Sequence, residues 1–361
     1  MSIEADTHNS QSSRDTRSTH ASIAEATFLE QPSAFLNFDR RSKMSLEDKS
    51  TLYRSLISLI RTNCEFDDAL QDRAAQFLQS LEPKWNEKEK AAKLVTDLVP
   101  SSAGSPSDFV ASILTLLSSP HSKVTKAALS FLSATINASP DEIRCRLVES
   151  DLITNLLATV QPHTLPISGN EALMNNLIGI IGNCVKLVSS SYLSGLGVTA
   201  AVEKSERREV IFHKVVIPSS QFVTFLIANR YLLNEELFHS LMFLFNKFIQ
   251  ICLYYRPTLE FVLASPIVMA FSSCLSIVEY ENRLWVFLGN INLSLRECTE
   301  YGPEVVQCKK RMIEALFSEG YEDSLEQMMK NDKDGPYGRG VVTNCHFISQ
   351  LLGSNVKNTE W

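Results

Sequence analysis

Apolar residues recur at helical spacing through most of this chain. In the segment 151–160, DLITNLLATV, they return every three or four positions and form one stripe, while Asp, Thr and Asn take the opposite side. Strand-like alternation is nearly absent, and the segment 209–217, EVIFHKVVI, is the one strand candidate. Gly and Pro are few and fall between the apolar blocks. The pattern therefore predicts an all-α fold.

The predicted helices recur as a unit. Several segments open with an apolar pair that ends one helix, pass through a break of Ser, Pro, Asp or Gly, and begin a helix of about three turns. These segments are LVPSSAGSPSDFVASILTLLSS, LVESDLITNLLATVQ, VVIPSSQFVTFLIAN, VLASPIVMAFSSCLS and LFSEGYEDSLEQMMK. A third helix follows each of them, and residues 70–81 have the pattern of a third helix from an earlier, incomplete unit. Because one unit leaves its apolar stripes uncovered, we expect about five units to stack on one another.

One run lacks charge altogether. Residues 261–278, FVLASPIVMAFSSCLSIV, approach the roughly 18 to 20 residues that a membrane-spanning helix needs. Pro266 divides the run and leaves pieces that are too short to span a bilayer. We therefore interpret it as the end of one buried helix and the start of the next, and expect no transmembrane segment.

The composition changes at both ends of the chain. Residues 1–33 are rich in Ser, Thr and charge and poor in large apolar groups, so they cannot bury enough surface to offset the entropy of ordering. We expect a disordered tail over 1–33, an α-solenoid over 34–354 and a flexible terminus over 355–361.

The segment Phe109–Val160 resembles an armadillo repeat. It carries an L-L-S-S-P turn, a V-x-x-x-A-L-x-x-L third helix from Val124 to Leu132, the first-helix ending L-V-E-S and a renewed L-x-x-L-L. The whole chain also resembles protist proteins with armadillo-like helices, which implies a fold and no function. The resemblance implies a right-handed armadillo-like superhelix of about five three-helix repeats, with third helices lining a concave face.

Armadillo proteins commonly bind extended peptides on that face through a recurring Trp and Asn. Aligned on this pattern, the Trp position reads Ser130, Gly179 and Phe243, and the Asn position reads Ala134, Asn183 and Lys247. Because only Asn183 is kept, the resemblance implies partner binding in general rather than peptide binding of the importin or catenin kind. The candidate partner-binding residues are Ser130, Asn183, Phe243 and Lys247.

No catalytic or cofactor motif stands out. The sequence lacks a dinucleotide fingerprint, a P-loop, H-E-x-x-H and G-x-S-x-G. NDKDGPYGRG, residues 331–340, fails as a calcium loop because Lys330 and Val341 occupy the positions of its first and last carboxylates. Cys345 and His346 are adjacent, so on a helix they point about 100° apart and form no nucleophile–base pair. We expect no enzyme activity, no cofactor and no metal site.

Charge and cysteine content narrow the class of partner. The net charge is −7, which argues against nucleic acid as the main partner. The 8 cysteines form no C-x-x-C pair and the amino terminus has no apolar signal region, so we expect a reducing compartment, the cytoplasm or the nucleus. Three short basic clusters keep contact with an anionic lipid as an alternative. They are Arg40, Arg41 and Lys43; Lys204, Arg207 and Arg208; and Lys309, Lys310 and Arg311.

These observations favour a non-catalytic intracellular scaffold or adaptor that binds a protein or peptide on its concave face. Two alternatives remain, a regulatory subunit of an enzyme complex and a peripheral membrane or trafficking adaptor. Two insertions, residues 161–170 and 189–206, are further candidates for binding surfaces, because insertions in solenoids often map to such surfaces.

Overall fold

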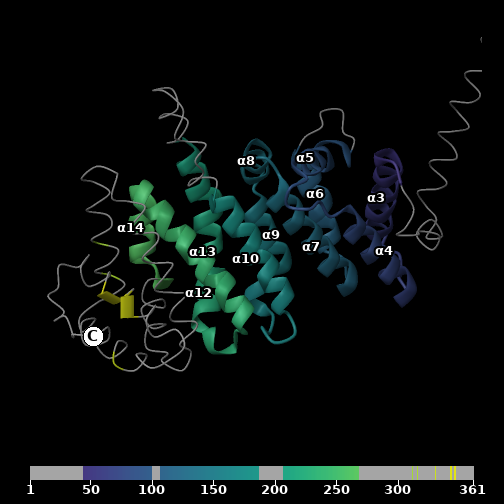
Figure 1. Cartoon of the computed structure of the whole chain (residues 1–361). Coiled ribbons are helices and arrows are strands. Elements are labelled where there is room, and N and C mark those ends of the chain that lie inside the picture. Colours follow the sequence, from purple (N-terminus) through teal and green to yellow (C-terminus); the bar gives the residue numbers. More distant parts are fainter. Residues whose placement is uncertain are drawn as a thin grey trace, which may run out of the picture. The chain divides into compact units, whose positions relative to one another are not determined.

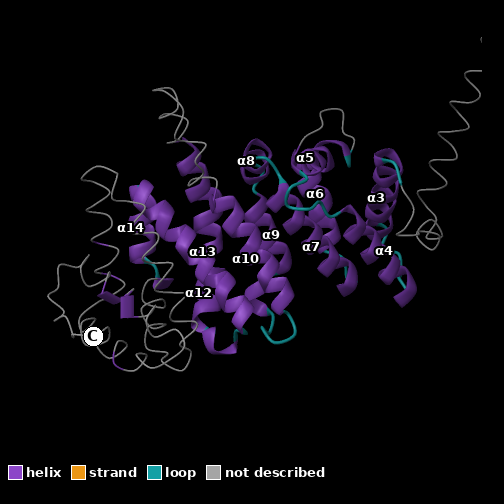
Figure 2. Cartoon of the chain, viewed as in Figure 1, coloured by secondary structure: helices purple, strands orange, loops and turns teal. Residues whose placement is uncertain are grey.

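The computed structural model describes residues 44–99, 106–186 and 206–267, together with residues 311, 315, 330, 342, 343, 345 and 346. Over these residues the chain is all-α and contains no strand (Figure 2). The predicted tail 1–33, the terminus 355–361 and residues 189–205 of the second insertion lie outside the described residues. The chain divides into two units, residues 1–131 and 132–361, with the boundary inside helix α7.

The first unit contains helices that begin at identifiable caps. Ser45 and Asp48 form a reciprocal capping box at the start of α3, and the Asp67 side chain accepts from the backbone N–H of Leu70 at the start of α4. Helix α6 packs against both α3 and α5. The helices are α3 (Leu46–Arg61), α4 (Asp68–Leu81), α5 (Lys88–Asp97), α6 (Pro106–Leu117) and the start of α7 (Ser122–Ala138) (Figure 1).

Aromatic rings fill the interior of the first unit. Tyr53, Phe109 and Phe131 are completely buried. The ring of Phe131 meets the other two edge-on, with centroids 6.4 Å from Tyr53 and 6.1 Å from Phe109. The Tyr53 hydroxyl lies 2.9 Å from the Ser112 hydroxyl, which satisfies the one polar atom that this ring brings into the core.

In the second unit, three helices of one predicted repeat contact their counterparts in the next. Helix α9 packs on α12, α10 packs on α13, and α8 packs on the η4 segment. This packing follows the predicted three-helix pattern. The elements are α8 (Asp141–Glu149), α9 (Leu152–Val160), η1 (Pro162–Thr164), α10 (Glu171–Val185), η4 (Phe212–Val216), α12 (Ile217–Ala228), η5 (Arg230–Leu232), α13 (Glu235–Tyr254) and α14 (Arg256–Ala264) (Figure 1).

The break between α8 and α9 lies at Asp151, which adopts the left-handed conformation with φ 56°. Its carboxylate forms an ion pair with Lys214 of the η4 segment, and the Lys214 Nζ atom lies 2.6 Å from Oδ1 of Asp151. An Asp tolerates this backbone conformation better than most residues because its short polar side chain makes local hydrogen bonds. The predicted break of this unit is therefore also a contact to the next one.

The next junction differs from the prediction. We expected a helix to end before Pro218 and a new one to begin there, and 209–217 was the strand candidate. The expected break is wrong, because Glu206–Ala228 is one continuous helix with a π turn over Phe212–Val216, and the strand candidate is helical, in agreement with the predicted all-α fold. The backbone N–H of Ile217 donates to the carbonyl of Phe212, five residues earlier. Pro218 lacks an N–H and its ring crowds the carbonyl four residues earlier, and the wider π turn accommodates both effects.

The Glu206–Ala228 helix is long and apolar enough to cross a bilayer by length and composition. Half of the most apolar stretch of this helix is buried inside the protein. The helix packs against α9 and α14, among other elements. The core helix of a stacked protein passes the same test, so this helix is weak evidence for a membrane span. Of the apolar run 261–278, the described part shows α14 ending at Ala264 and a helical backbone resuming at Pro266.

Candidate functional site

Helices α10 and α13 lie side by side and supply the surface on which three of the four candidate residues lie. Near the start of both helices the Asn175 side-chain amide donates to Glu236 at 2.9 Å. The Asn234 side chain caps α13 by accepting from the backbone N–H of Leu237 at 2.9 Å. We call this surface the third-helix face; it comprises Asn175, Gly179, Gly182 and Asn183 of α10 and Glu236, Phe243 and Lys247 of α13.

Phe243 is the aromatic side chain of this face, and 43% of its surface is exposed. Its ring lies against Gly182 of α10, where an added Cβ atom would sit 3.4 Å from the ring Cε1. Because Gly182 has no side chain, the two helices approach closely there and the ring rests on the backbone of α10. Phe243 is therefore supported from beneath and remains open to solvent.

Lys247 follows Phe243 by one helical turn, and its Nζ atom lies 5.3 Å from the centroid of the Phe243 ring. A cation at this distance is attracted by the negative face of the ring. The contact positions the ammonium group beside the exposed aromatic surface. The third-helix face thus offers an apolar contact and a positive charge next to each other.

Asn183 is half-buried, and its side-chain amide donates to the carbonyl of Gly179 in its own helix at 2.9 Å. Its own carbonyl accepts from the Arg144 guanidinium at 3.4 Å, and Arg144 also pairs with Asp141. Asn183 is therefore tied into the first and third helices of its repeat. With one donor engaged in its own helix, it is less suited to hold a partner than Phe243 and Lys247.

Ser130, the fourth candidate residue, lies half-buried on α7 among residues of the first unit. Its place in the third-helix pattern stays a prediction. Sequence reasoning missed Gly182, Asn175 and Glu236. A glycine inside a helix costs about 1 kcal/mol relative to alanine, which often signals a close approach of another backbone or side chain. That signal was present at Gly182, but it did not identify Phe243 as the neighbour.

The described residues do not show a reactive constellation. Among them, no group of three or more His, Cys, Asp or Glu side chains could hold a metal ion. Burial raises the pKa of Cys184 to about 12, and burial also raises the pKa of the Cys145 thiol. Both thiols are therefore protonated at neutral pH and are poor nucleophiles.

The basic clusters are partly engaged inside the protein. Arg311 makes a two-pronged contact with Glu260, at 2.6 Å and 2.9 Å between guanidinium nitrogens and carboxylate oxygens. Arg207 and Arg208 are half-buried, and each interacts with other groups of the chain. The other members of the three clusters lie outside the described residues. The described arginines therefore form no open basic surface.

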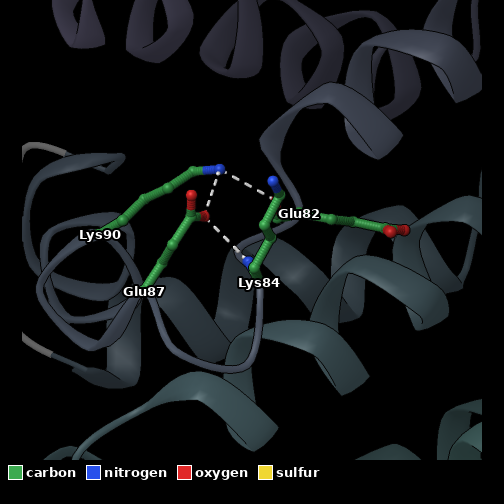
Figure 3. Close-up of polar contacts among 4 residues, drawn as sticks. All are labelled: Glu82, Lys84, Glu87 and Lys90. Carbon is green, nitrogen blue, oxygen red and sulfur yellow. Dashed lines mark hydrogen bonds and ion pairs between the residues drawn. The ribbon is translucent and has the colours of Figure 1, made fainter.

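In the first unit, the turn before α5 presents Trp85 with 77% of its surface exposed. Glu87 accepts from the backbone N–H of Lys84 at 2.9 Å and from the Lys90 ammonium at 3.2 Å, and Lys90 also donates to the carbonyl of Glu82 at 3.0 Å (Figure 3). These contacts fix the turn. A single exposed large side chain is normal on a protein surface, so Trp85 by itself marks no site.

Comparison with known proteins shows the fold of this chain and does not show its function. No protein-family model matches the sequence, and no curated protein does. A computationally designed armadillo repeat protein for modular peptide recognition matches with a TM-score of 0.50 at 12% identity, covering 82% of this chain and 98% of the designed one.

Two engineered proteins match with lower TM-scores. One has a TM-score of 0.47 at 14% identity and covers 82% of this chain and 96% of its own. The other has a TM-score of 0.28 at 14% identity and covers 93% and 91%. The match to the designed armadillo repeat protein with a TM-score of 0.50 confirms the predicted armadillo-like repeat fold, and the described part of the chain is all-α. The handedness and the number of repeats stay predictions.

Proposed function

We propose that this chain is a non-catalytic scaffold that binds a segment of a partner protein on the third-helix face of α10 and α13. Phe243 carries the proposal. It is an aromatic side chain that is 43% exposed although its apolar neighbours Leu241, Met242, Leu244 and Phe245 on the same helix are buried. Aromatic anchors of this kind contribute a large share of the energy in protein interfaces.

Two further observations support the same surface. The Phe243 ring is held by Gly182 below and Lys247 beside it, so little side-chain freedom is lost when a partner covers it. The designed armadillo protein of the same fold is described as made for modular peptide recognition, which supports a peptide segment as the bound element. The proposal places the chain in the cytoplasm or nucleus and assigns it no nucleic-acid partner.

A selection from a random peptide display library against the purified full chain tests this proposal. The selected peptides are resynthesised and their dissociation constants measured for the wild type and for Phe243→Ala. We expect Phe243→Ala to weaken binding at least about tenfold. Tyr231→Ala is the matched control, because Tyr231 is a 70% exposed aromatic of the same unit that lies on the η5 turn. Peptides that bind Phe243→Ala as tightly as the wild type would contradict the proposal.

A further inference from the structure

The third-helix face has a charge asymmetry along α13 that bears on the chemistry of its partner. Glu235 and Glu236 are exposed in the first turn of the helix, and Lys247 lies near Phe243 further along. From Glu236 to Lys247 the helix advances eleven residues, or about 16 Å at 1.5 Å per residue. The two ends of the face therefore carry opposite charge, with the exposed aromatic ring close to the positive end.

The contact between Lys247 and Phe243 joins the positive charge to the apolar surface. The ammonium has three N–H donors, so it can bind a carboxylate in addition to the contacts that it makes within the chain. A carboxylate bound there would bring its neighbouring side chain over the Phe243 ring. A basic side chain at the same place would be repelled by Lys247 and would gain no partner.

The opposite end of the face supports the same orientation. The Asn175 amide holds Glu236 at 2.9 Å, which keeps a carboxylate at the α10–α13 contact. An acidic partner residue is disfavoured there and favoured at Lys247. Asn183 adds no competing charge, because its side chain is a neutral amide, and that amide donates to the carbonyl of Gly179.

We infer that the third-helix face selects a partner segment in which an acidic residue lies next to, or one position from, an aromatic or aliphatic residue. The apolar side chain covers Phe243 beside Gly182, and the carboxylate binds the Lys247 ammonium. This inference rests on the proposed function, and it adds the charge of the partner to it.

The test uses synthetic fluorescein-labelled peptides with Gly-Ser flanks and a central Asp-Phe, Asn-Phe or Lys-Phe pair, together with the same pairs separated by one residue. Their binding to the full chain is measured by fluorescence anisotropy at low salt. We expect the Asp peptides to bind at least about tenfold more tightly than the Lys peptides, and added salt to reduce the difference. Lys247→Gln is expected to remove the preference and Lys247→Glu to reverse it.

The outcomes separate this inference from the proposed function. If the Asp and Lys peptides bind the wild type equally and Phe243→Ala weakens both, the face binds segments without selecting for charge, and the inference fails alone. If Lys247→Glu leaves the preference for Asp unchanged, the charge selection does not come from Lys247 and the inference also fails. If no peptide binding depends on Phe243, the proposed function and the inference fail together.

Discussion

Phe243 of α13 lies over Gly182 of α10, so close that a Cβ atom at Gly182 would be 3.4 Å from the ring. The two residues belong to third helices of successive predicted units and are far apart in sequence. Their contact joins the packing of the repeat to the surface that we propose as the binding site. The glycine keeps the ring accessible by leaving room beneath it.

Gly182 substitutions are expected to separate stability from binding. Gly182→Ala removes the helix cost of glycine and meets the ring at the edge of ordinary contact, so we expect the free energy of unfolding to rise by up to about 1 kcal/mol. Gly182→Leu is expected to displace the Phe243 ring and weaken binding of the selected peptides. Chemical denaturation and anisotropy measure the two quantities. Gly179→Ala is the matched control for the unfolding measurement, since its Cβ would meet the Ser133 hydroxyl at 3.5 Å and no ring.

Asp151 combines a left-handed backbone with an ion pair, and substitutions can separate the two. Asp151→Asn tolerates the backbone and loses only a half-exposed ion pair to Lys214, so we expect a cost below about 1 kcal/mol. Asp151→Val cannot adopt φ 56° without strain and is expected to cost about 1 to 3 kcal/mol more. Lys214→Ala removes the ion pair alone and serves as the control. Equal unfolding midpoints for the Asn and Val variants would show that the backbone conformation is not the costly element.

Tyr53 is expected to make the first unit sensitive to alkali. Burial raises the pKa of its hydroxyl, because the phenolate would lose its hydration, and the bond to Ser112 offsets only part of this. The folded state therefore keeps a proton that the unfolded chain releases near pH 10. The contribution to stability is complete below about pH 10 and declines as the pH rises above it.

The variant Tyr53→Phe removes this alkaline decline. Ser112 still donates to the carbonyl of Phe109 at 2.7 Å, so no buried hydroxyl is left unpaired, and we expect a loss of about 1 kcal/mol at neutral pH. Urea unfolding at neutral pH and above pH 10 measures both effects. An alkaline decline of equal size in wild type and variant would assign it to other groups.

Glu87 is expected to titrate at a lower pH than an ordinary glutamate, because its pKa is lowered. The backbone N–H of Lys84 and the ammonium of Lys90 both hold its carboxylate, and they lower its pKa from the ordinary 4.5. Its stabilising effect on the turn is present above about pH 4.5 and is lost as the pH falls through the lowered pKa. NMR titration of the Glu87 carboxyl carbon measures this. Lys90→Met should move the pKa back towards its ordinary value, and Lys88→Met, which removes an exposed neighbouring charge, should change it less.

The order and type of most described helices could be predicted from apolar spacing. The apolar spacing of residues 151–160 predicts a helix that begins after a helix break, and the structure has α9 over Leu152–Val160. Pro218 could not be interpreted correctly, because a proline usually marks a helix start and a π turn has no local sequence pattern of its own. The strand-like pattern of 209–217 comes from its β-branched residues, of which Ile211, Val215 and Val216 are buried in a helix.

The candidate site was only partly predictable. The register of the resemblance placed Asn183, Phe243 and Lys247 on third helices, and the structure has them there. The contacts that define the surface join residues 61 positions apart, as between Asn175 and Glu236, or pair a glycine with a distant ring. Such contacts depend on how successive units stack, and apolar periodicity within one helix carries no information about them.

The π turn over Phe212–Val216 has more residues in one helical turn than a regular α-helix has. A helix with one residue more or fewer in that turn would rotate everything before it by about a quarter of a circle. Residues 206–211 are therefore rotated about the helix axis relative to the positions that a regular α-helix would give them, so the face that they bury is set by the π turn.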